Sequence, residues 1–536
     1  MDCSTVIVRY LKAAGVQRVF GYPGDPSVPF LEAMRREDME FVLATREGTA
    51  GLMAEADGFI SGRPGVCLST LGPGSSNLVN AVANALLDRV PMIALSGQIE
   101  TKREQLFTHQ VLDHSKLFGP ISKWTATIAP HTVGSIVRRG LRVAMADRPG
   151  PVHISTPADY VGAVATDSDI VLPPMTETDD GIRVFRTADA ADPVKRIAES
   201  RSPIILAGIS AQRAGAGDSI VALAERLGCP IIVAPMAKGV VPETHSLFAG
   251  TLDMACNEVV WDFLRRADLL LNIGFDAVEL IKPWSVKAPV IHIDSTPNTD
   301  QIYFAETEIV GNIRSAVRFL AESLPSSSER WTMAAIAEHR SVLRERYFSG
   351  RVAGKLNPTD VVETMRAASP NDAIATTDVG SHKLLVGQGW TTHVPRGVMM
   401  TNGLSSMGYS LPAAIAAKLH DPSRDVVCFT GDGGLAMVQG ELRAASTLGL
   451  GITVVVFCDN SLNRIELKQM AKQFPSTGTR IDPTNVALAA ESMACDGIMV
   501  DSVAGLESAL ASRNPGSTKP LVIGAQIDPE QYAAQF

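Results

Sequence analysis

The sequence predicts an α/β protein made of three doubly wound domains, each built on a parallel sheet. Short, continuously apolar runs alternate with longer helical patterns along the whole chain, as in parallel sheets that helices cover on both faces. The 536 residues exceed what one hydrophobic core holds, because cores stop growing at roughly 250–300 residues. Two polar breaks then divide the chain into separate units.

The predicted strands fall into one group for each domain. The first group is RVFGYPG (18–24), EFVLAT (40–45), GVCLST (65–70) and PMIALSG (91–97). The second is PIILAG (203–208), PIIVAP (230–235), DLLLNIG (268–274) and PVIHID (289–294). The third is AIATTD (373–378), DVVCFTGDGG (425–434), ITVVVFCDN (452–460) and KPLVIGAQID (519–528). Polar, Pro- and Ser-rich segments at 166–183 and 323–331 separate the groups, which predicts domains at 1–165, 185–325 and 345–536.

Composition excludes several classes of partner. The net charge of −9 is unfavourable for binding a nucleic-acid backbone and favours a small-molecule substrate. The seven cysteines are scattered, form no CxxC pair and predict neither a zinc site nor a disulfide framework. The chain has no run of apolar residues long enough to span a membrane, and residues 1–16 read as an amphipathic helix rather than a signal peptide. We therefore expect a cytoplasmic protein.

The sharpest motif joins two neighbouring strands of the third group. One strand leads into Gly431, Asp432, Gly433 and Gly434, with a helix following to about 449–451, and the next strand ends at Asn460. Parallel strands of open α/β sheets present ligand sites at their carboxyl ends, where glycines let backbone N–H groups approach a phosphate. Carboxylate and amide oxygens together with phosphate oxygens suit Mg²⁺. The pattern predicts a magnesium-bridged diphosphate.

The alternative is that GDGG is only a strand-to-helix turn, since Gly and Asp are common turn residues. The second half of the pattern, which follows after the 25 residues 434–458, makes it resemble the thiamine-diphosphate motif that begins with GDG and ends with Asn. That resemblance implies Mg²⁺ ligation by Asp432, by the Asn460 side chain and by the Leu462 carbonyl. Asp459 stands where the family usually has a first Asn, but the ligand is the second residue.

Glu47, in the segment TREGTAG, is the candidate for activating the cofactor. In this family a Glu at that position donates a hydrogen bond to N1′ of the aminopyrimidine. The alternative is a carboxylate that interacts only with the dipole of its helix, worth about 0.3–1 kcal/mol. The order GYPGD (21–25), REGTAG (46–51), LGPGSSN (71–77) and then GDG favours the catalytic role.

These motifs, with NGLSSMGYSLPAAIAA (402–417), resemble acetolactate synthase and its close relatives over essentially the whole chain. The resemblance implies thiamine diphosphate and Mg²⁺ as cofactors, and pyrimidine-binding, central and diphosphate-binding domains in that order. Residues 108–124 and 268–280 are more similar to the catabolic, flavin-independent enzymes, and Gln469 replaces a Trp of the biosynthetic ones. FAD is therefore not expected, although a vestigial flavin stays open.

The resemblance also implies a set of cofactor-binding residues. They are Pro23, Gly24, Asn77, Val379, Gly380, Ser381, His382, Gly403, Ser405, Met407, Gly431, Gly433, Gly434 and Asn460. Ser381 replaces the usual Gln, and Met407 would press the pyrimidine toward the thiazolium. For Met407 the alternative is ordinary core packing.

Four polar residues besides Glu47 are candidates for contact with substrate: Asp25, His109, Gln110 and Glu466. Glu466 is the departure, because acetolactate synthases usually have an apolar residue there, whereas pyruvate-decarboxylase-like enzymes use an Asp, a His and a Glu to release an aldehyde. A nearby general acid favours protonation of the carbanion that remains after CO₂ leaves. Alternatively Glu466 is a solvated residue of an amphipathic helix.

The leading functional prediction is decarboxylation of a 2-oxo acid such as pyruvate with carboligation to a second carbonyl compound. The alternatives are a 2-oxo acid decarboxylase that releases an aldehyde, a benzoin-type carboligase or lyase, and a cofactor-binding scaffold without turnover. The resemblance further implies a homodimer or homotetramer with active sites between subunits.

Overall fold

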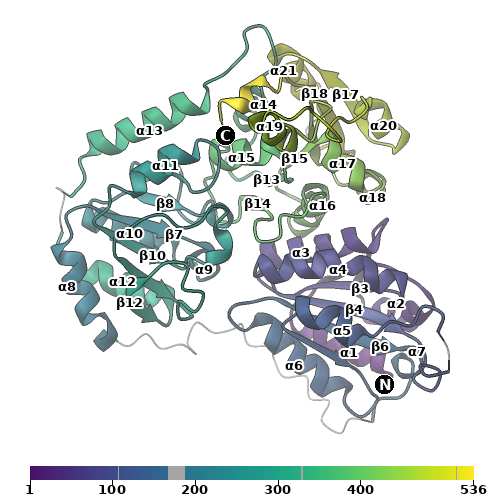
Figure 1. Cartoon of the computed structure of the whole chain (residues 1–536). Coiled ribbons are helices and arrows are strands. Elements are labelled where there is room, and N and C mark those ends of the chain that lie inside the picture. The colour runs from purple at the N-terminus through teal and green to yellow at the C-terminus, as the bar shows by residue number, and fades with distance from the viewer. Residues whose placement is uncertain (107, 167–186, 327–329, 515, 536) are drawn as a thin grey trace. The chain divides into compact units, whose positions relative to one another are not determined.

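The computed structural model describes residues 1–106, 108–166, 187–326, 330–514 and 516–535. It contains three six-stranded sheets in which every strand pair is parallel (Figure 1). The predicted α/β class and the three parallel-sheet domains are confirmed. The predicted break at 166–183 lies, apart from Thr166, outside the described residues, and so does the 327–329 part of the break at 323–331.

The first sheet has the strand order β2-β1-β3-β4-β6-β5. Its strands are β1 (Arg18–Tyr22), β2 (Glu40–Leu43), β3 (Gly65–Ser69), β4 (Met92–Gln98), β5 (Trp124–Thr127) and β6 (Pro151–Pro157). Its helices are α1 (Cys3–Ala13), α2 (Val28–Arg36), α3 (Glu47–Ser61), α4 (Pro73–Leu87), α5 (His114–Phe118), α6 (Val133–Met145) and α7 (Ala158–Val161). The pair α3 and α4 covers one face of the sheet, and α1 and α6 cover the other (Figure 1).

The second sheet has the order β12-β11-β10-β7-β8-β9. Its strands are β7 (Pro203–Ala207), β8 (Ile231–Val233), β9 (Phe248–Thr251), β10 (Leu269–Ile273), β11 (Val290–Asp294) and β12 (Ala305–Val310). Its helices are α8 (Ala191–Glu199), α9 (Ile209–Arg213), α10 (Gly217–Leu227), α11 (Asn257–Leu264) and α12 (Ile313–Ser323), and α13 (Met333–Tyr347) follows.

The third sheet has the order β14-β13-β15-β16-β18-β17. Its strands are β13 (Ile374–Thr377), β14 (Val398–Met400), β15 (Val426–Gly431), β16 (Thr453–Cys458), β17 (Asp496–Val500) and β18 (Leu521–Gln526). The helices of this part are α14 (Pro358–Ala367), α15 (Ser381–Gly389), α16 (Ser410–His420), α17 (Asp432–Val438), α18 (Glu441–Thr447), α19 (Asn463–Ala471), α20 (Val486–Ser492), α21 (Val503–Ala511) and α22 (Glu530–Ala533).

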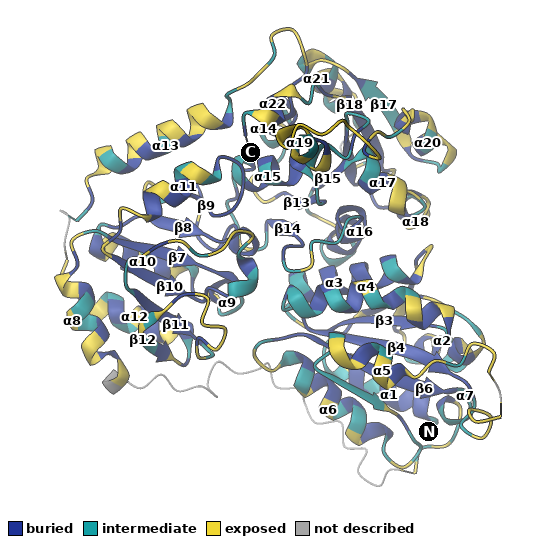
Figure 2. Ribbon diagram, in the orientation of Figure 1, coloured by how far each residue is buried: buried dark blue, intermediate teal, exposed yellow. Residues whose placement is uncertain are grey.

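Two compact units organise these elements. The first comprises residues 1–179 with 403–422 and 438–448, and the second comprises the remainder. In the first unit α16 packs on α3, where Gly51 leaves room for the neighbouring α4. In the second unit one continuous apolar core runs through both of its sheets. Figure 2 shows that the strands are largely buried, while exposed residues lie on outer helix faces such as those of α13.

Each of the predicted strands is present, and six further strands were not predicted from the sequence. Five of these six, β5, β9, β12, β14 and β17, lie at sheet edges, and β9 and β14 are runs of only four and three residues. The sixth, β6, is interior, but its sequence PVHISTP carries polar residues. The helix expected after Gly434 is divided in two. Helix α17 ends at Val438, before Gln439 and Gly440, and α18 begins at Glu441.

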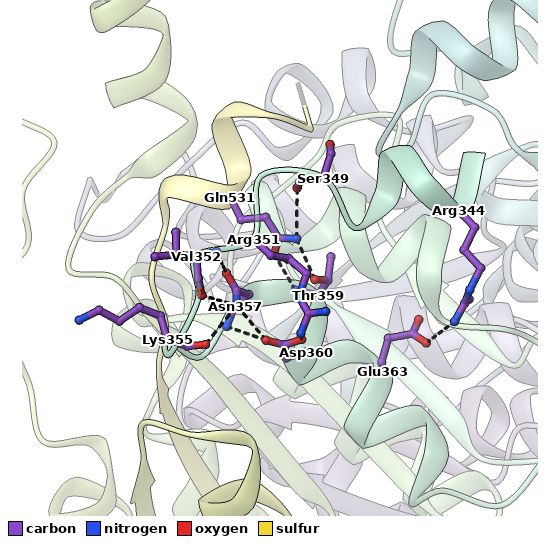
Figure 3. A network of polar contacts seen from close by, with 10 residues as sticks. All are labelled: Arg344, Ser349, Arg351, Val352, Lys355, Asn357, Thr359, Asp360, Glu363 and Gln531. Atoms are coloured by element: carbon purple, nitrogen blue, oxygen red, sulfur yellow. Dashed lines mark hydrogen bonds and ion pairs between the residues drawn. The ribbon is translucent and has the colours of Figure 1, made fainter. Parts of the chain in front are cut away.

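A polar network in the second unit fastens α14 and the C-terminal α22 to the segment that follows α13 (Figure 3). The Gln531 Oε1 atom accepts hydrogen bonds from the backbone N–H and the hydroxyl of Thr359, at 3.1 and 3.0 Å. Asn357 donates to the carbonyls of Val352 and Lys355 at 3.2 and 3.1 Å, so it closes this turn at the start of α14. These bonds hold the third sheet's first helix in place.

Candidate functional site

The predicted diphosphate site lies where three adjacent strands of the third sheet end. Strands β13, β15 and β16 are neighbours, and Asp378, Asp432 and Asn460 stand at or just after their carboxyl ends. Because parallel strands end at the same edge, residues far apart in the sequence come together there. The structure thus brings together the predicted segments 379–382, 431–434 and 460–462.

Asp432 is fixed by two backbone donors from different segments. Gly433 N–H donates to Oδ1 at 2.7 Å, and Asn460 N–H donates to Oδ2 at 2.8 Å. Burial raises the pKa of Asp432, and these hydrogen bonds partly offset that effect. Burial, together with the nearby Asp432 charge, raises the pKa of Asp459 to about 7. A cation placed here would relieve the cost of gathering two carboxylates.

Asn460 adopts the left-handed backbone conformation, with φ 56°. Few non-glycine residues take this conformation, and Asn does so more readily than most. Among the described residues no hydrogen bond uses the Asn460 side chain, whereas its N–H and carbonyl are engaged by Asp432 and Ile481. The Leu462 carbonyl accepts from the N–H groups of Ile465 and Glu466 at 2.8 and 3.1 Å.

Close approach requires a glycine at position 434 and leaves little room for a side chain at position 431. A Cβ on Gly434 would lie 2.6 Å from Oδ2 of Asp378, and a Cβ on Gly431 would lie 3.3 Å from the His382 ring. His382 is buried and stacks on Phe457 with ring centroids 5.2 Å apart. Burial lowers the pKa of His382 to about 3, with a smaller effect from the charge of Lys383.

The residues present fit a magnesium-bound diphosphate. The His382 Nε2 atom is buried and has no hydrogen-bond partner among the described residues, and buried polar groups are normally paired. Asp432 and the unengaged Asn460 side chain supply hard oxygen ligands. Within the described part of the chain no group of three or more His, Cys, Asp or Glu side chains could hold a metal ion.

The segment 379–382 is held by neighbouring polar groups. Val379 N–H donates to the Asp378 carboxylate at 2.7 Å, and the Ser381 hydroxyl donates to the side-chain oxygen of Asn463 at 2.7 Å. Gly380 packs against the His382 ring, since a Cβ there would lie 2.6 Å from Cε1. Ser381, which replaces the family's Gln, therefore joins this segment to the first residue of α19.

Glu466 is neither solvated nor free. It is 6% exposed, accepts hydrogen bonds from the hydroxyls of Ser461 and Ser476, and forms an ion pair with Arg480 at 2.6 Å. Burial raises its pKa, but the hydrogen bonds and the ion pair outweigh burial, so the pKa is lowered. The interpretation of Glu466 as a solvated helix residue is wrong.

Glu47 is buried at the first position of α3, after Arg46. Asn77 of α4 donates its side-chain N–H to Oε2 at 3.0 Å. A Cβ on Gly74 would lie 3.1 Å from Oε1, so this glycine keeps the space beside the second oxygen open. The structure therefore brings together two of the predicted residues, Glu47 and Asn77.

The predicted substrate residues of the first unit line one turn. Gly24 packs on Thr70, because a Cβ on Gly24 would lie 2.3 Å from the threonine hydroxyl. Gln110, with φ 61°, packs on Gly72, because a Cβ added to Gly72 would lie 2.7 Å from the Gln110 Cβ. Pro23 is half-buried, whereas Asp25 and His109 are exposed. The segments that carry Asp25 and His109 thus both lie at the 70–73 turn.

Gly403, Ser405 and Met407 lie in the segment between β14 and α16, which belongs to the first unit. Gly403 N–H donates to the Asp88 carboxylate at 2.6 Å, and a Cβ on Gly403 would lie 2.5 Å from the Leu87 carbonyl oxygen. Ser405 has φ 57°. Met407 is only half-buried, so it is not a buried core residue.

Two buried carboxylates, Asp378 and Glu441, were not singled out from the sequence. Asp378 is fully buried and accepts a hydrogen bond from the Thr430 hydroxyl at 3.2 Å. It could have been found, because it follows a predicted strand directly, as Asp432 does. Glu441 accepts from the N–H and hydroxyl of Thr45 and from Thr49. The sequence gives no signal for Glu441, since only the packing of α18 brings it to α3.

Comparisons with known proteins match the chain domain by domain. Models of the thiamine pyrophosphate enzyme family match as the N-terminal TPP binding domain at residues 1–117, the central domain at 190–320 and the C-terminal TPP binding domain at 378–525. The catabolic acetolactate synthase of Raoultella terrigena is 30% identical over 94% of this chain and 91% of its own length. The acetolactate synthase large subunit of Corynebacterium glutamicum is 30% identical (87% and 76%), and the acetolactate synthase of Bacillus subtilis is 26% identical (98% and 92%).

Proposed function

Because this chain belongs to the acetolactate synthase family of thiamine pyrophosphate enzymes, we propose that it is a thiamine-diphosphate- and Mg²⁺-dependent transferase. It removes CO₂ from a 2-oxo acid such as pyruvate and joins the remaining unit to a second carbonyl compound. The observation that carries the proposal is the carboxyl edge of the third sheet, where Asp432 is fixed by donors from both halves of the GDG…N motif.

The diphosphate end of the cofactor is assigned to the second unit. Mg²⁺ would be held by Asp432, the Asn460 side chain and the Leu462 carbonyl. The backbone of 379–382, the unpartnered His382 nitrogen and the glycines 431, 433 and 434 would face the diphosphate. Thiamine diphosphate, when bound, supplies an acidic carbon that attacks the keto group and then holds the electron pair that CO₂ leaves.

The aminopyrimidine end is assigned to Glu47, with Gly403, Ser405 and Met407 bracketing the ring. Glu47 would donate a hydrogen bond to the ring nitrogen and so fix the reactive tautomer, while Asn77 orients its carboxyl group. Pro23 and Gly24 would lie against the cofactor, and Asp25, His109 and Gln110 against the substrate.

The assembly belongs to the same proposal. We expect a homodimer or homotetramer with the Glu47 of one chain serving the diphosphate site of another. The proposal also includes domain boundaries at 1–165, 185–325 and 345–536. It includes a cytoplasmic location, which is consistent with cysteines that are all free thiols. In the described part of the chain no helix has the length and apolar character to cross a membrane.

FAD is not part of the proposed reaction, and Gln469, at the position of the flavin enzymes' Trp, is bonded to Thr477.

Aldehyde release is the second candidate function, and Glu466 is the residue that favours it. A carboxyl group close to the proposed metal-binding segment 460–462 could protonate the unit left after decarboxylation. Both of its oxygens, however, already accept hydrogen bonds and one also pairs with a guanidinium. Carboligation is therefore the better supported outcome.

Two measurements test the proposal. Calorimetry of the full chain should show uptake of thiamine diphosphate that depends on Mg²⁺ and disappears with a chelator. NMR analysis of the products from pyruvate should then show acetolactate. Acetaldehyde alone would contradict carboligation, and binding without CO₂ release from any 2-oxo acid would favour a scaffold.

A further inference from the structure

The metal loop 460–462 is paired with a second segment, 476–481, that the functional assignment does not use. Leu462 N–H donates to the Thr479 carbonyl at 2.7 Å, and Ile481 N–H donates to the Asn460 carbonyl at 2.9 Å. Ser461 and Arg480 form an isolated antiparallel bridge between these two bonds. The backbone on both sides of Ser461 is therefore held by one short stretch of chain.

Glu466 joins these two segments with its side chain. On the loop side it accepts from the Ser461 hydroxyl, and on the other side from Ser476 at 2.7 Å and from Arg480 at 2.6 Å. Its own N–H donates to the Leu462 carbonyl at 3.1 Å. Since the carboxylate is 6% exposed, removal of either hydroxyl partner would leave a buried acceptor unsatisfied.

We infer that Glu466 is a positioning residue, whose carboxylate fastens segment 476–481 to the metal loop, and that it is not the acid that decides between carboligation and aldehyde release. The inference rests on the proposed function for the identity of the metal loop. A carboxylate that accepts two hydroxyl protons and a guanidinium proton has no proton of its own to give, and its oxygens are committed to the loop.

The loop is also connected to the diphosphate segment. Asn463, the first residue of α19, accepts from the Ser381 hydroxyl at 2.7 Å. The position of α19, on which Glu466 lies, therefore affects both the metal ligands and segment 379–382. Residues that support metal ligands in this way typically change metal affinity by about 10–100-fold when they are removed.

Three variants test the inference. Glu466→Ala removes all three side-chain contacts, whereas Glu466→Gln keeps an acceptor oxygen for one hydroxyl, offers an N–H that the other hydroxyl can accept, and loses the ion pair. We expect Glu466→Ala to weaken Mg²⁺-dependent uptake of thiamine diphosphate about tenfold or more in calorimetry, and Glu466→Gln to retain most of it. The ratio of acetolactate to acetaldehyde from pyruvate should stay unchanged in both. Arg480→Gln, at an exposed position, tests the same cluster if Glu466→Ala fails to fold.

Hydrogen exchange of the cofactor-free protein provides a readout that needs no activity. The amides of Leu462 and Ile481 should exchange faster in Glu466→Ala and in Arg480→Gln than in the unmodified protein. Unchanged exchange and Mg²⁺ dependence, together with a changed product ratio in Glu466→Gln, would overturn the inference and identify Glu466 as the proton donor. If the unmodified protein takes up no cofactor, the proposed function fails instead, and the exchange comparison still decides the role of Glu466.

Discussion

Two buried glutamates among the predicted site residues differ in their side-chain partners. Glu466 has both oxygens committed to Ser461, Ser476 and Arg480. Glu47 accepts one side-chain hydrogen bond among the described residues, from Asn77, and its other oxygen lies beside Gly74. Residue type and helix position are similar in the two cases, so only the partners show which carboxyl group is available for chemistry.

Glu47→Gln should abolish most of the turnover while leaving the cofactor bound. The amide cannot cycle a proton with the aminopyrimidine, and loss of such acid–base catalysis costs roughly 10²–10⁴-fold in rate. CO₂ release from pyruvate measures turnover, and calorimetry measures uptake of thiamine diphosphate. Asp218→Asn, which changes an exposed first-turn carboxylate of α10, is the matched control and should leave both unchanged. Full activity of the Glu47→Gln variant would show that the Glu47 carboxylate only interacts with the dipole of its helix.

A buried histidine pair makes the first unit sensitive to acid. His114 bonds to the Ser155 hydroxyl at 2.9 Å and lies edge-to-face against His153, and burial lowers the pKa of His114 to about 4. The unfolded chain has the ordinary value of about 6.5, so it binds more protons between these two pH values. The stability that neutral His114 contributes is present above pH 6.5 and is lost as the pH falls toward 4.

Urea unfolding at pH 7 and pH 5 measures this effect. His114 should account for about 2 kcal/mol of the stability lost between these two pH values. His114→Gln should remove that share of the loss, whereas His131→Gln, at an exposed position, should not. A pH dependence identical in all three proteins would contradict the assignment.

At the scale of one element, α4 carries a polar stripe that no sequence motif indicates. Asn80, Asn84 and Asp88 are spaced four residues apart and therefore share a helix face, with Asp88 at the helix cap. Asn80 donates to the Ser406 hydroxyl at 2.6 Å, and Asp88 accepts from the Gly403 N–H at 2.6 Å. The stripe fixes the segment that we assign to the aminopyrimidine.

The same stripe includes a buried carboxyl group of α3. Asn84 donates to both oxygens of Glu55 at 2.7 and 2.9 Å, and to Asp88 at 3.1 Å. Burial and the charge of Asp88 raise the pKa of Glu55 well above its ordinary value. The raised pKa favours the neutral form of Glu55, which lowers the cost of placing two carboxyl groups in this interior.

Asp88→Ala should destabilise the first unit by about 1–3 kcal/mol, because the Gly403 N–H loses its acceptor inside the protein. Asp88→Asn keeps an acceptor oxygen at the same place and should cost less. Urea midpoints of the two variants, compared with the unmodified protein, give the difference. Equal losses in the two variants would show that the charge, and not the hydrogen bond to Gly403, is what matters.

At the scale of the whole molecule, the proposed catalytic groups come from two compact units of the chain. Glu47 belongs to the first unit, and Asp432 and Asn460 belong to the second. If each active site takes Glu47 from one subunit and Asp432 from another, the two functions can be restored between chains.

Mixing two inactive variants tests this arrangement. Glu47→Gln and Asp432→Asn proteins should each lack activity, but subunit exchange between them should give about a quarter of the unmodified activity, because half of the dimers then contain one intact site. CO₂ release before and after mixing is the measurement. No recovery, with exchange demonstrated by mass spectrometry, would place both residues of a site in the same chain.

Sequence patterns by themselves determined the α/β class, the three parallel sheets and twelve of their strands, whereas the interior strand β6, whose sequence PVHISTP carries polar residues, was missed. They also located Asp432 and Asn460, because the ends of adjacent parallel strands have a fixed place on the sheet edge. The edge strands β5, β9, β12, β14 and β17 were also missed, and none of them is longer than six residues.

Only the tertiary structure showed that Glu466 is buried and paired, because its partners Ser476 and Arg480 lie on a separate segment. It likewise revealed Glu441 and the stripe on α4, which depend on helices that meet across long stretches of chain. The physical reason is the same in each case. Strand burial is set by local residue pattern, whereas the partner of a buried polar group is chosen by packing and leaves no periodic signal in the sequence.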